Sequence, residues 1–140
     1  MLVTQVSWNP SLYYYHSIVP PVNIGVSAQY LWKGLWIGEV RAVELGGEVR
    51  VLPFGTDMRG FYLAGYLNYA TVVAERSRHS FSWWWSNGWL VGWQWFPVYN
   101  IAAGICMGAE VWHFPESESA GHELGYSGMP IARIQIGYAW

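Results

Sequence analysis

The sequence predicts an all-β fold: an eight-stranded antiparallel up-and-down transmembrane β-barrel with a polar, side-chain-filled interior, in a single domain spanning residues 1–140. Apolar and polar residues alternate with a period of two in segments of about ten residues separated by turn-like residues, as in membrane barrels. Charged residues make up only 11% of the chain, against roughly 25% in a typical soluble domain. The 11 Trp and 10 Tyr residues favour the boundary between water and hydrocarbon.

Five segments show the alternation clearly, and each is interpreted as one strand. At the C-terminal end, Ile134, Ile136 and Tyr138 share one face, and Arg133 and Gln135 share the other. The remaining four segments lie near residues 22–32, 61–74, 82–95 and 99–111. No run reaches the roughly 20 consecutive apolar residues of a membrane helix, so a helical membrane protein is not expected.

Two stretches are harder to divide into strands. Residues 2–14 are interpreted as one strand with Pro10 at a bulge or bend, because proline cannot donate a ladder hydrogen bond. Residues 36–51 are interpreted as two short strands with a tight connection near Arg41–Val43, although one long strand with a bulge has a similar pattern. The count is then eight, which places the termini and the turns near Lys33, Pro53–Gly60 and Pro97 on one side. The loops near residues 16–21, 76–81 and 113–130 fall on the other side.

The face opposite the apolar one identifies which side meets lipid. A soluble barrel turns its apolar face inward, whereas a membrane barrel turns it outward. We expect a nearly balanced polar network in the interior, formed by Glu39, Arg41, Glu44, Glu48, Arg50, Glu110 and Arg133. We also expect a membrane-interface girdle formed by Tyr30, Trp32, Trp36, Phe61, Trp93, Trp95, Tyr99, Tyr138 and Trp140. The alternative, an aromatic core in a soluble β-protein, fits less well with a single Lys in the whole chain.

The closing segment IARIQIGYAW and the stretch RVLPFGTDMRGFYLAGYLNYA resemble the small eight-stranded outer-membrane β-barrel proteins of Gram-negative bacteria. The resemblance implies an outer-membrane location, a lipid bilayer around the chain, and recognition of the terminal strand by the barrel-assembly machinery through Tyr138 and Trp140. Contacts with other envelope proteins also fit this setting. The chain departs from the family in the tight connection near residue 42 and in its first residues. MLVTQVSW lacks the basic region and apolar core of a secretory signal.

Little in the sequence indicates chemistry. An eight-stranded interior is only wide enough for side chains, so an open pore is not expected. The four His residues are not spaced as metal ligands, and a single Cys excludes a multi-cysteine metal site, so we expect no metal and no cofactor. A net charge of −2 without a basic patch argues against nucleic acid.

The leading hypothesis is a nonenzymatic outer-membrane protein with a structural, surface-contact or complex-subunit role. A membrane-embedded lipid hydrolase or deacylase is the first alternative, and its weak catalytic candidates are His79, Ser80 and Ser82, which match no motif for that reaction. A soluble, lipocalin-like ligand-binding barrel is the second alternative.

Overall fold

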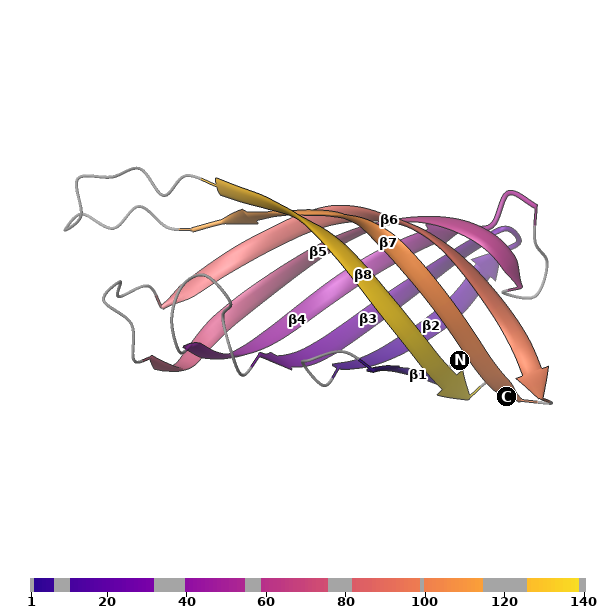
Figure 1. Cartoon of the computed structure of the whole chain (residues 1–140), viewed down its shortest axis with the longest axis horizontal. Coiled ribbons are helices and arrows are strands. Elements are labelled where there is room, and N and C mark those ends of the chain that lie inside the picture. Colours follow the sequence, from indigo (N-terminus) through magenta and orange to yellow (C-terminus); the bar gives the residue numbers. More distant parts are fainter. Residues whose placement is uncertain are drawn as a thin grey trace.

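The computed structural model describes residues 2–6, 11–31, 40–54, 59–75, 82–98, 100–114 and 126–138. All regular structure in these ranges is β-strand, which confirms the all-β class (Figure 1). The strands are β1 (Leu2–Val6), β2 (Ser11–Val19), β3 (Val22–Leu31), β4 (Val40–Val51), β5 (Gly60–Glu75), β6 (Trp83–Val98), β7 (Ile101–His113) and β8 (Tyr126–Tyr138). In these ranges, no helix is long and apolar enough to span a membrane.

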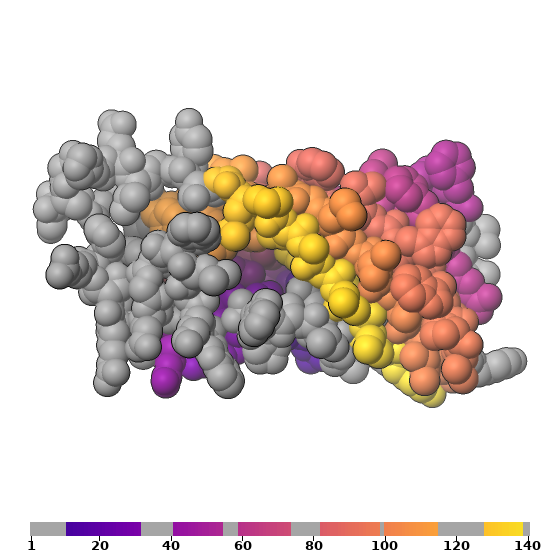
Figure 2. Space-filling model, in the orientation of Figure 1, coloured from indigo at the N-terminus to yellow at the C-terminus, as the bar shows by residue number. Residues whose placement is uncertain are grey.

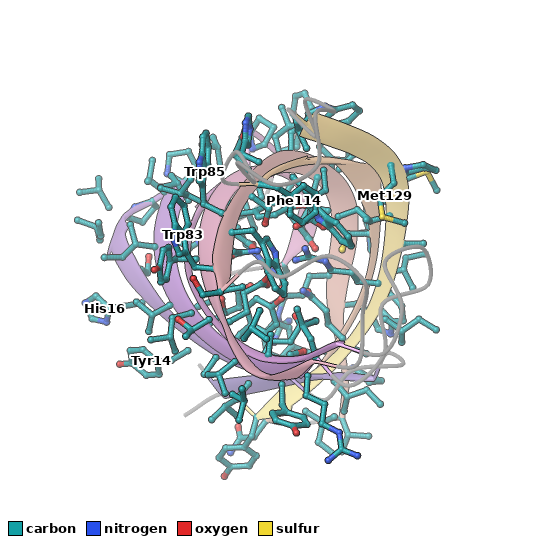
Figure 3. All side chains as sticks on the ribbon, turned by 90° about the vertical axis from the view of Figure 1, so that its left-hand side faces the viewer. Tyr14, His16, Trp83, Trp85, Phe114 and Met129 are labelled. Atoms are coloured by element: carbon teal, nitrogen blue, oxygen red, sulfur yellow. The ribbon has the colours of Figure 1, made fainter. Side chains whose placement is uncertain are left out.

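Each strand pairs antiparallel with the next strand in the sequence, so the expected up-and-down order is confirmed. The five-residue β1 also pairs with β8, from Leu2 opposite Tyr138 to Val6 opposite Ile134. The order of strands therefore returns to its start. Viewed along the strands, the sheet curves around an interior into which Phe114 projects, while Tyr14 and His16 point away from it (Figure 3).

The division of the two difficult stretches was wrong in both places. Residues 40–51 form one strand, β4, rather than two strands joined near Arg41–Val43. Its pairing with β5 shifts between Arg41 and Ala42, as in the alternative of one long strand with a bulge. The N-terminal stretch holds two strands, β1 and β2, which end and begin on either side of Pro10. One error removed a strand from the expected number, and the other added one.

The end of β6 and the start of β8 also differ from the strand boundaries that the sequence predicted. Phe96, Pro97 and Val98, expected as a turn, belong to β6, and the register between β6 and β7 shifts between Trp95 and Val98. This irregularity accommodates Pro97, which lacks the N–H of a ladder donor. The loop expected to reach Met129 is shorter, because β8 begins at Tyr126.

The new division changes which connections share an end of the sheet. Residues 20–21, 52–59 and 99–100 connect strands at the end where both termini lie, on the right of Figure 1. Residues 7–10, 32–39, 76–82 and 114–125 connect strands at the opposite end. The expected sides of Lys33 and of residues 16–21 were therefore wrong. We call the two ends the short-turn end and the long-loop end.

Burial alternates along the strands and separates two faces. On β2, Tyr13 and Tyr15 are buried, whereas the alternating residues Leu12 and Tyr14 are exposed. On β4, Glu48 and Arg50 are buried while Val49 is 48% exposed. The inward face thus carries the polar and charged side chains, and the outward face carries the large aliphatic ones. This matches the predicted assignment of faces.

Glycines on the inward face make room for tyrosines on the neighbouring strand. Tyr15 lies opposite Gly25 and Tyr62 lies opposite Gly92 in the register. A Cβ atom placed on Gly25 would be 2.5 Å from the Tyr15 ring, and one on Gly92 would be 2.6 Å from the Tyr62 hydroxyl oxygen. Each ring therefore covers bare glycine backbone, which lets large side chains fit within a narrow, strongly curved sheet.

Candidate functional site: the charged interior

Arg50 is the centre of a buried hydrogen-bond network at the short-turn half of the interior. Its side chain is 2% exposed, and its Nε donates to Glu48 Oε1 at 2.5 Å. Its Nη1 donates to Gln94 Oε1 at 2.9 Å, and its Nη2 donates to Gln135 Oε1 at 3.0 Å and to the Tyr15 hydroxyl oxygen at 2.5 Å. The guanidinium thus binds partners on β2, β4, β6 and β8.

Aromatic rings support the same guanidinium from two sides. The Arg50 Cζ atom lies 3.9 Å from the centroid of the Tyr15 ring and 4.4 Å from that of Tyr62. Both hydroxyl groups also donate into the network, Tyr15 to Glu48 Oε1 at 3.1 Å and Tyr62 to Gln135 Oε1 at 3.3 Å. A desolvated cation held over aromatic faces gains about 2 kcal/mol per contact. Burial of Arg50 is therefore compensated by both hydrogen bonds and ring contacts.

Arg133 is the second buried cation, and its partners are fewer. Its Nη1 donates to the Tyr13 hydroxyl oxygen at 3.2 Å and lies 4.0 Å from Glu48 Oε2. Its Cζ atom lies 4.6 Å from the centroid of the Tyr66 ring. Glu48 consequently lies between the two arginines, one on each of its carboxylate oxygens.

Most of the predicted interior charges are where the sequence placed them. Five of the seven are buried in the interior, namely Glu44, Glu48, Arg50, Glu110 and Arg133. Arg41 is an error: its side chain is exposed, because β4 continues without a break and places Arg41 on the outward face with Val43. Near the end of its strand, a long Arg side chain can reach water from that face. Glu39 lies outside the described residues.

The network also contains residues that the sequence reasoning did not assign to it. Gln94 and Gln135 lie on the polar face of their strands but were not predicted to join the network. Tyr15 was not predicted to face the interior at all. The run Tyr13-Tyr14-Tyr15 shows no alternation between apolar and polar residues. The polar Ser11 and the apolar Leu12 indicate which positions of this strand face inward. Continuing their alternation would have placed Tyr13 and Tyr15 on the inward face.

A small aromatic group closes the interior near the long-loop end. Phe114 lies 6.3 Å from Trp84 and 6.2 Å from Trp112, measured between ring centroids. Trp84 also packs with Ala42 and Ala70, which are both fully buried. Trp84 therefore lies on the inward face of β6, in phase with the buried Ser86.

The outward face carries the aromatic residues expected of a girdle, at both ends of the strands. Of the predicted set, Tyr30, Trp93, Trp95 and Tyr138 are exposed and Phe61 is half-buried. Trp32, Trp36, Tyr99 and Trp140 lie outside the described residues. Figure 2 shows large side chains of β6 gathered at the short-turn end.

Further aromatic residues, which were not in the predicted girdle, lie on the outward face near the long-loop end. The rings of Tyr69 and Trp83 stack with centroids 6.0 Å apart, and those of Trp85 and His113 stack at 3.6 Å. The His113 ring also shares a hydrogen bond of 2.9 Å between its Nε2 and Asn87 Oδ1. Tyr30, predicted beside a short turn, belongs to this end because the connection after β3 lies there.

An apolar groove of about 930 Å³ crosses the outer surface of β5–β8. Its walls are the side chains of Phe61, Trp93, Ile105, Met107 and Ile134, and its floor is formed at Gly92 and Ala132, where side chains are small. A groove of this kind fits extended hydrocarbon, and it contains no exposed nucleophile or base.

The described residues do not bring together the side chains proposed for a lipid hydrolase. Ser82 is exposed at the start of β6, whereas His79 and Ser80 lie outside the described residues. Within the part of the chain that the structure describes, no three His, Cys, Asp or Glu side chains come together as metal ligands. Comparisons with models of protein families, with curated proteins and with solved structures found no match.

Proposed function

We propose that this chain is an eight-stranded transmembrane β-barrel of a bacterial outer membrane, with a structural, surface-contact or complex-subunit role and no open pore. One observation carries the proposal: the sheet buries charged side chains inside and exposes large hydrophobic ones outside. Glu48 and Arg50 are 4% and 2% exposed, whereas Val26, Leu67 and Met107 are 62%, 57% and 67% exposed. In water this arrangement would leave the apolar face without a partner, and lipid supplies one.

The strand geometry supports a barrel of the right size. Leu2 pairs with Tyr14 on one side, and the successive partners lead through Val26, Gly47, Leu67, Asn87 and Val111 to Gly128 on β8. On its other side Leu2 pairs with Tyr138, so one circuit advances the register from Gly128 to Tyr138 along β8. With eight strands, that stagger corresponds to a tilt of about 40°, within the usual range for barrels.

Strand length supports a membrane span as well. A tilted transmembrane strand needs about 9–11 residues to cross the hydrocarbon. The strands β3 to β8 contain between 10 and 16 residues each. Two of the three connections at the short-turn end contain only two residues, and the longest connection, residues 114–125, lies at the long-loop end, as in outer-membrane barrels.

The interior network supports the absence of a pore. Arg50 on β4 contacts Tyr15 on β2, Tyr62 on β5, Gln94 on β6 and Gln135 on β8, so its contacts cross the interior from side to side. An eight-stranded barrel has room only for such side chains. The resulting plug leaves the outer surface and the long-loop end as the places where partners bind.

The dependence of folding on detergent or lipid tests this proposal. The purified chain should fold in detergent micelles or lipid vesicles and migrate differently on a denaturing gel with and without heating. In buffer alone it should aggregate. A folded monomer in buffer without detergent would overturn the membrane proposal and favour a soluble barrel. Incubation with outer-membrane lipids separates the remaining alternative, because released acyl chains that disappear in His79→Ala would establish a hydrolase.

A further inference from the structure

A second group of buried oxygen atoms lies on the inward face of β4–β7, closer to the long-loop end than Arg50. We call it the upper oxygen cluster, and it consists of Glu44, Tyr66, Asn68, Ser86 and Glu110. These residues are between 0% and 8% exposed. In the register, Asn68 lies opposite Ser86, while Tyr66 and Glu110 both lie opposite the same glycine, Gly88, on β6.

Two glycines make room for two of these side chains, Tyr66 over β6 and Asn68 over β4. A Cβ atom on Gly88 would be 2.6 Å from Cζ of the Tyr66 ring and would collide with its hydroxyl group. A Cβ atom on Gly46 would be 2.7 Å from Ser27 Oγ and would collide with Asn68 Oδ1. The polar tips of Tyr66 and Asn68 therefore lie directly over bare backbone. Side chains there would exclude them.

The cluster has more negative charge than the surrounding cations balance. Among the described residues the interior buries three glutamates, Glu44, Glu48 and Glu110, against two arginines, Arg50 and Arg133. Arg50 is already bound by Glu48. The charges of Glu44 and Glu110 repel each other, and Arg133 is the cation that acts on both. Arg133 itself lies 4.0 Å from Glu48 Oε2, so it is shared among three carboxylates.

Neutral oxygens in the cluster also lack partners. Within the described part of the chain, neither the Ser86 Oγ atom nor the Tyr66 hydroxyl oxygen has a hydrogen-bond partner, although both are buried. Leaving a buried polar group unpaired costs about 1–3 kcal/mol. Excess carboxylate charge together with unpaired oxygen atoms is the environment that a bound cation would satisfy.

We propose that the upper oxygen cluster is a binding site for a hard cation of the Ca²⁺ class. The carboxylates of Glu44 and Glu110 supply the charge, and Ser86 and Tyr66 supply neutral oxygen ligands. Hard cations prefer this all-oxygen set, and no histidine is involved, which is why histidine spacing gave no sign of it. The inference goes beyond the proposed function, because the site depends on the inward face alone.

The aromatic group above the cluster gives the site a spectroscopic probe. Trp112 lies opposite Ser86 in the register, and Trp84 lies two residues along β6 on the same inward face. Tb³⁺ takes the same oxygen ligands as Ca²⁺ and emits when a nearby indole is excited. Tb³⁺ bound in the cluster should therefore show strong emission on tryptophan excitation, and CaCl₂ should displace it.

The experiment measures Ca²⁺ binding to the full folded chain in detergent micelles by calorimetry, with Tb³⁺ emission as the second readout. The wild type should bind Ca²⁺ and show a higher unfolding temperature in CaCl₂ than in NaCl of equal ionic strength. Glu110→Gln, which keeps the side-chain shape, should weaken binding by about tenfold or more, and Ser86→Ala should weaken it less. The control variant Glu116→Gln/Glu118→Gln removes carboxylates of the long polar loop and should leave binding unchanged.

Three results would overturn the proposal. The first is the absence of Ca²⁺ binding and of a Ca²⁺-specific rise in unfolding temperature in the wild type, which needs no variant to fold. The second is binding that survives Glu110→Gln and disappears in the loop variant. The third is an equal response to Na⁺. None of these results depends on whether the chain needs a membrane, so failure here and failure of the proposed function are distinguishable.

Discussion

Replacing Arg50 by methionine should destabilise the folded chain strongly. The substitution removes the hydrogen bonds to Glu48, Gln94, Gln135 and Tyr15. The buried Glu48 carboxylate then keeps only the longer contact with Arg133, 4.0 Å from its Oε2, among the ion pairs of the described residues. Removing one partner of a buried ion pair costs about 3–5 kcal/mol, chiefly because the remaining charge is uncompensated. We therefore expect Arg50→Met to lower the free energy of unfolding by about that amount.

Three further variants, Glu48→Gln, its combination with Arg50→Met, and Arg41→Met, make this a test of charge pairing rather than of lost contacts. Adding Glu48→Gln to Arg50→Met removes the uncompensated charge, so the double variant should be less destabilised than the sum of the two single variants by about 2 kcal/mol. Arg41→Met changes an exposed arginine on the same strand and should alter stability by no more than about 0.5 kcal/mol. Urea unfolding in lipid vesicles, followed by tryptophan fluorescence, measures the free energy of unfolding of the wild type and of the four variants. Equal losses for Arg50→Met and Arg41→Met, or strict additivity in the double variant, would refute the reasoning.

Three other outcomes follow from the same structure. Val26→Arg should lower the free energy of unfolding in vesicles by about 2–4 kcal/mol, and by less in thinner bilayers. The loss caused by the inward-facing Ser27→Arg should not depend on lipid chain length. Equal lipid dependence of the two variants would contradict the face assignment. Gly92→Ala should cost about 1–3 kcal/mol because its Cβ would lie 2.6 Å from the Tyr62 hydroxyl oxygen, while Gly65→Ala, with nothing within 4 Å, should be neutral in the same unfolding assay. In planar bilayers the wild type should show no stepwise conductance, and discrete current steps would disprove the interior plug.

The faces of the strands were predictable because burial and lipid exposure both act with a period of two. Val26, Leu67 and Ile134 were expected on the outward face, and each is more than half exposed. The error at Arg41 arose from dividing residues 36–51 into two strands near Arg41–Val43, which assigned Arg41 to the polar face of the first strand. Arg41 tolerates the outward face because it lies near the end of β4, where a long cationic side chain reaches water.

The contacts of the candidate site could not be predicted in the same way. Arg50 and Gln135 are 85 residues apart in the sequence, and their hydrogen bond depends on the register of every intervening strand. The irregular pairing of β6 with β7 between Trp95 and Val98 changes that register. No local pattern specifies such shifts. The sequence therefore indicated which residues face the interior but not which of them meet.

The interior must satisfy two requirements at once, and different residues carry them. Charge balance depends on Arg50 and Glu48, whereas volume depends on glycines such as Gly92, which admits the Tyr62 ring. Tyr62 links the two requirements, because its ring lies 4.4 Å from the Arg50 Cζ atom and over Gly92. Gly92→Ala displaces the ring that supports the guanidinium, so its effect should depend on whether Arg50 is present. Combined with Arg50→Met it should therefore cost less than the sum of the single effects, whereas Gly65→Ala, on the outward face, should simply add.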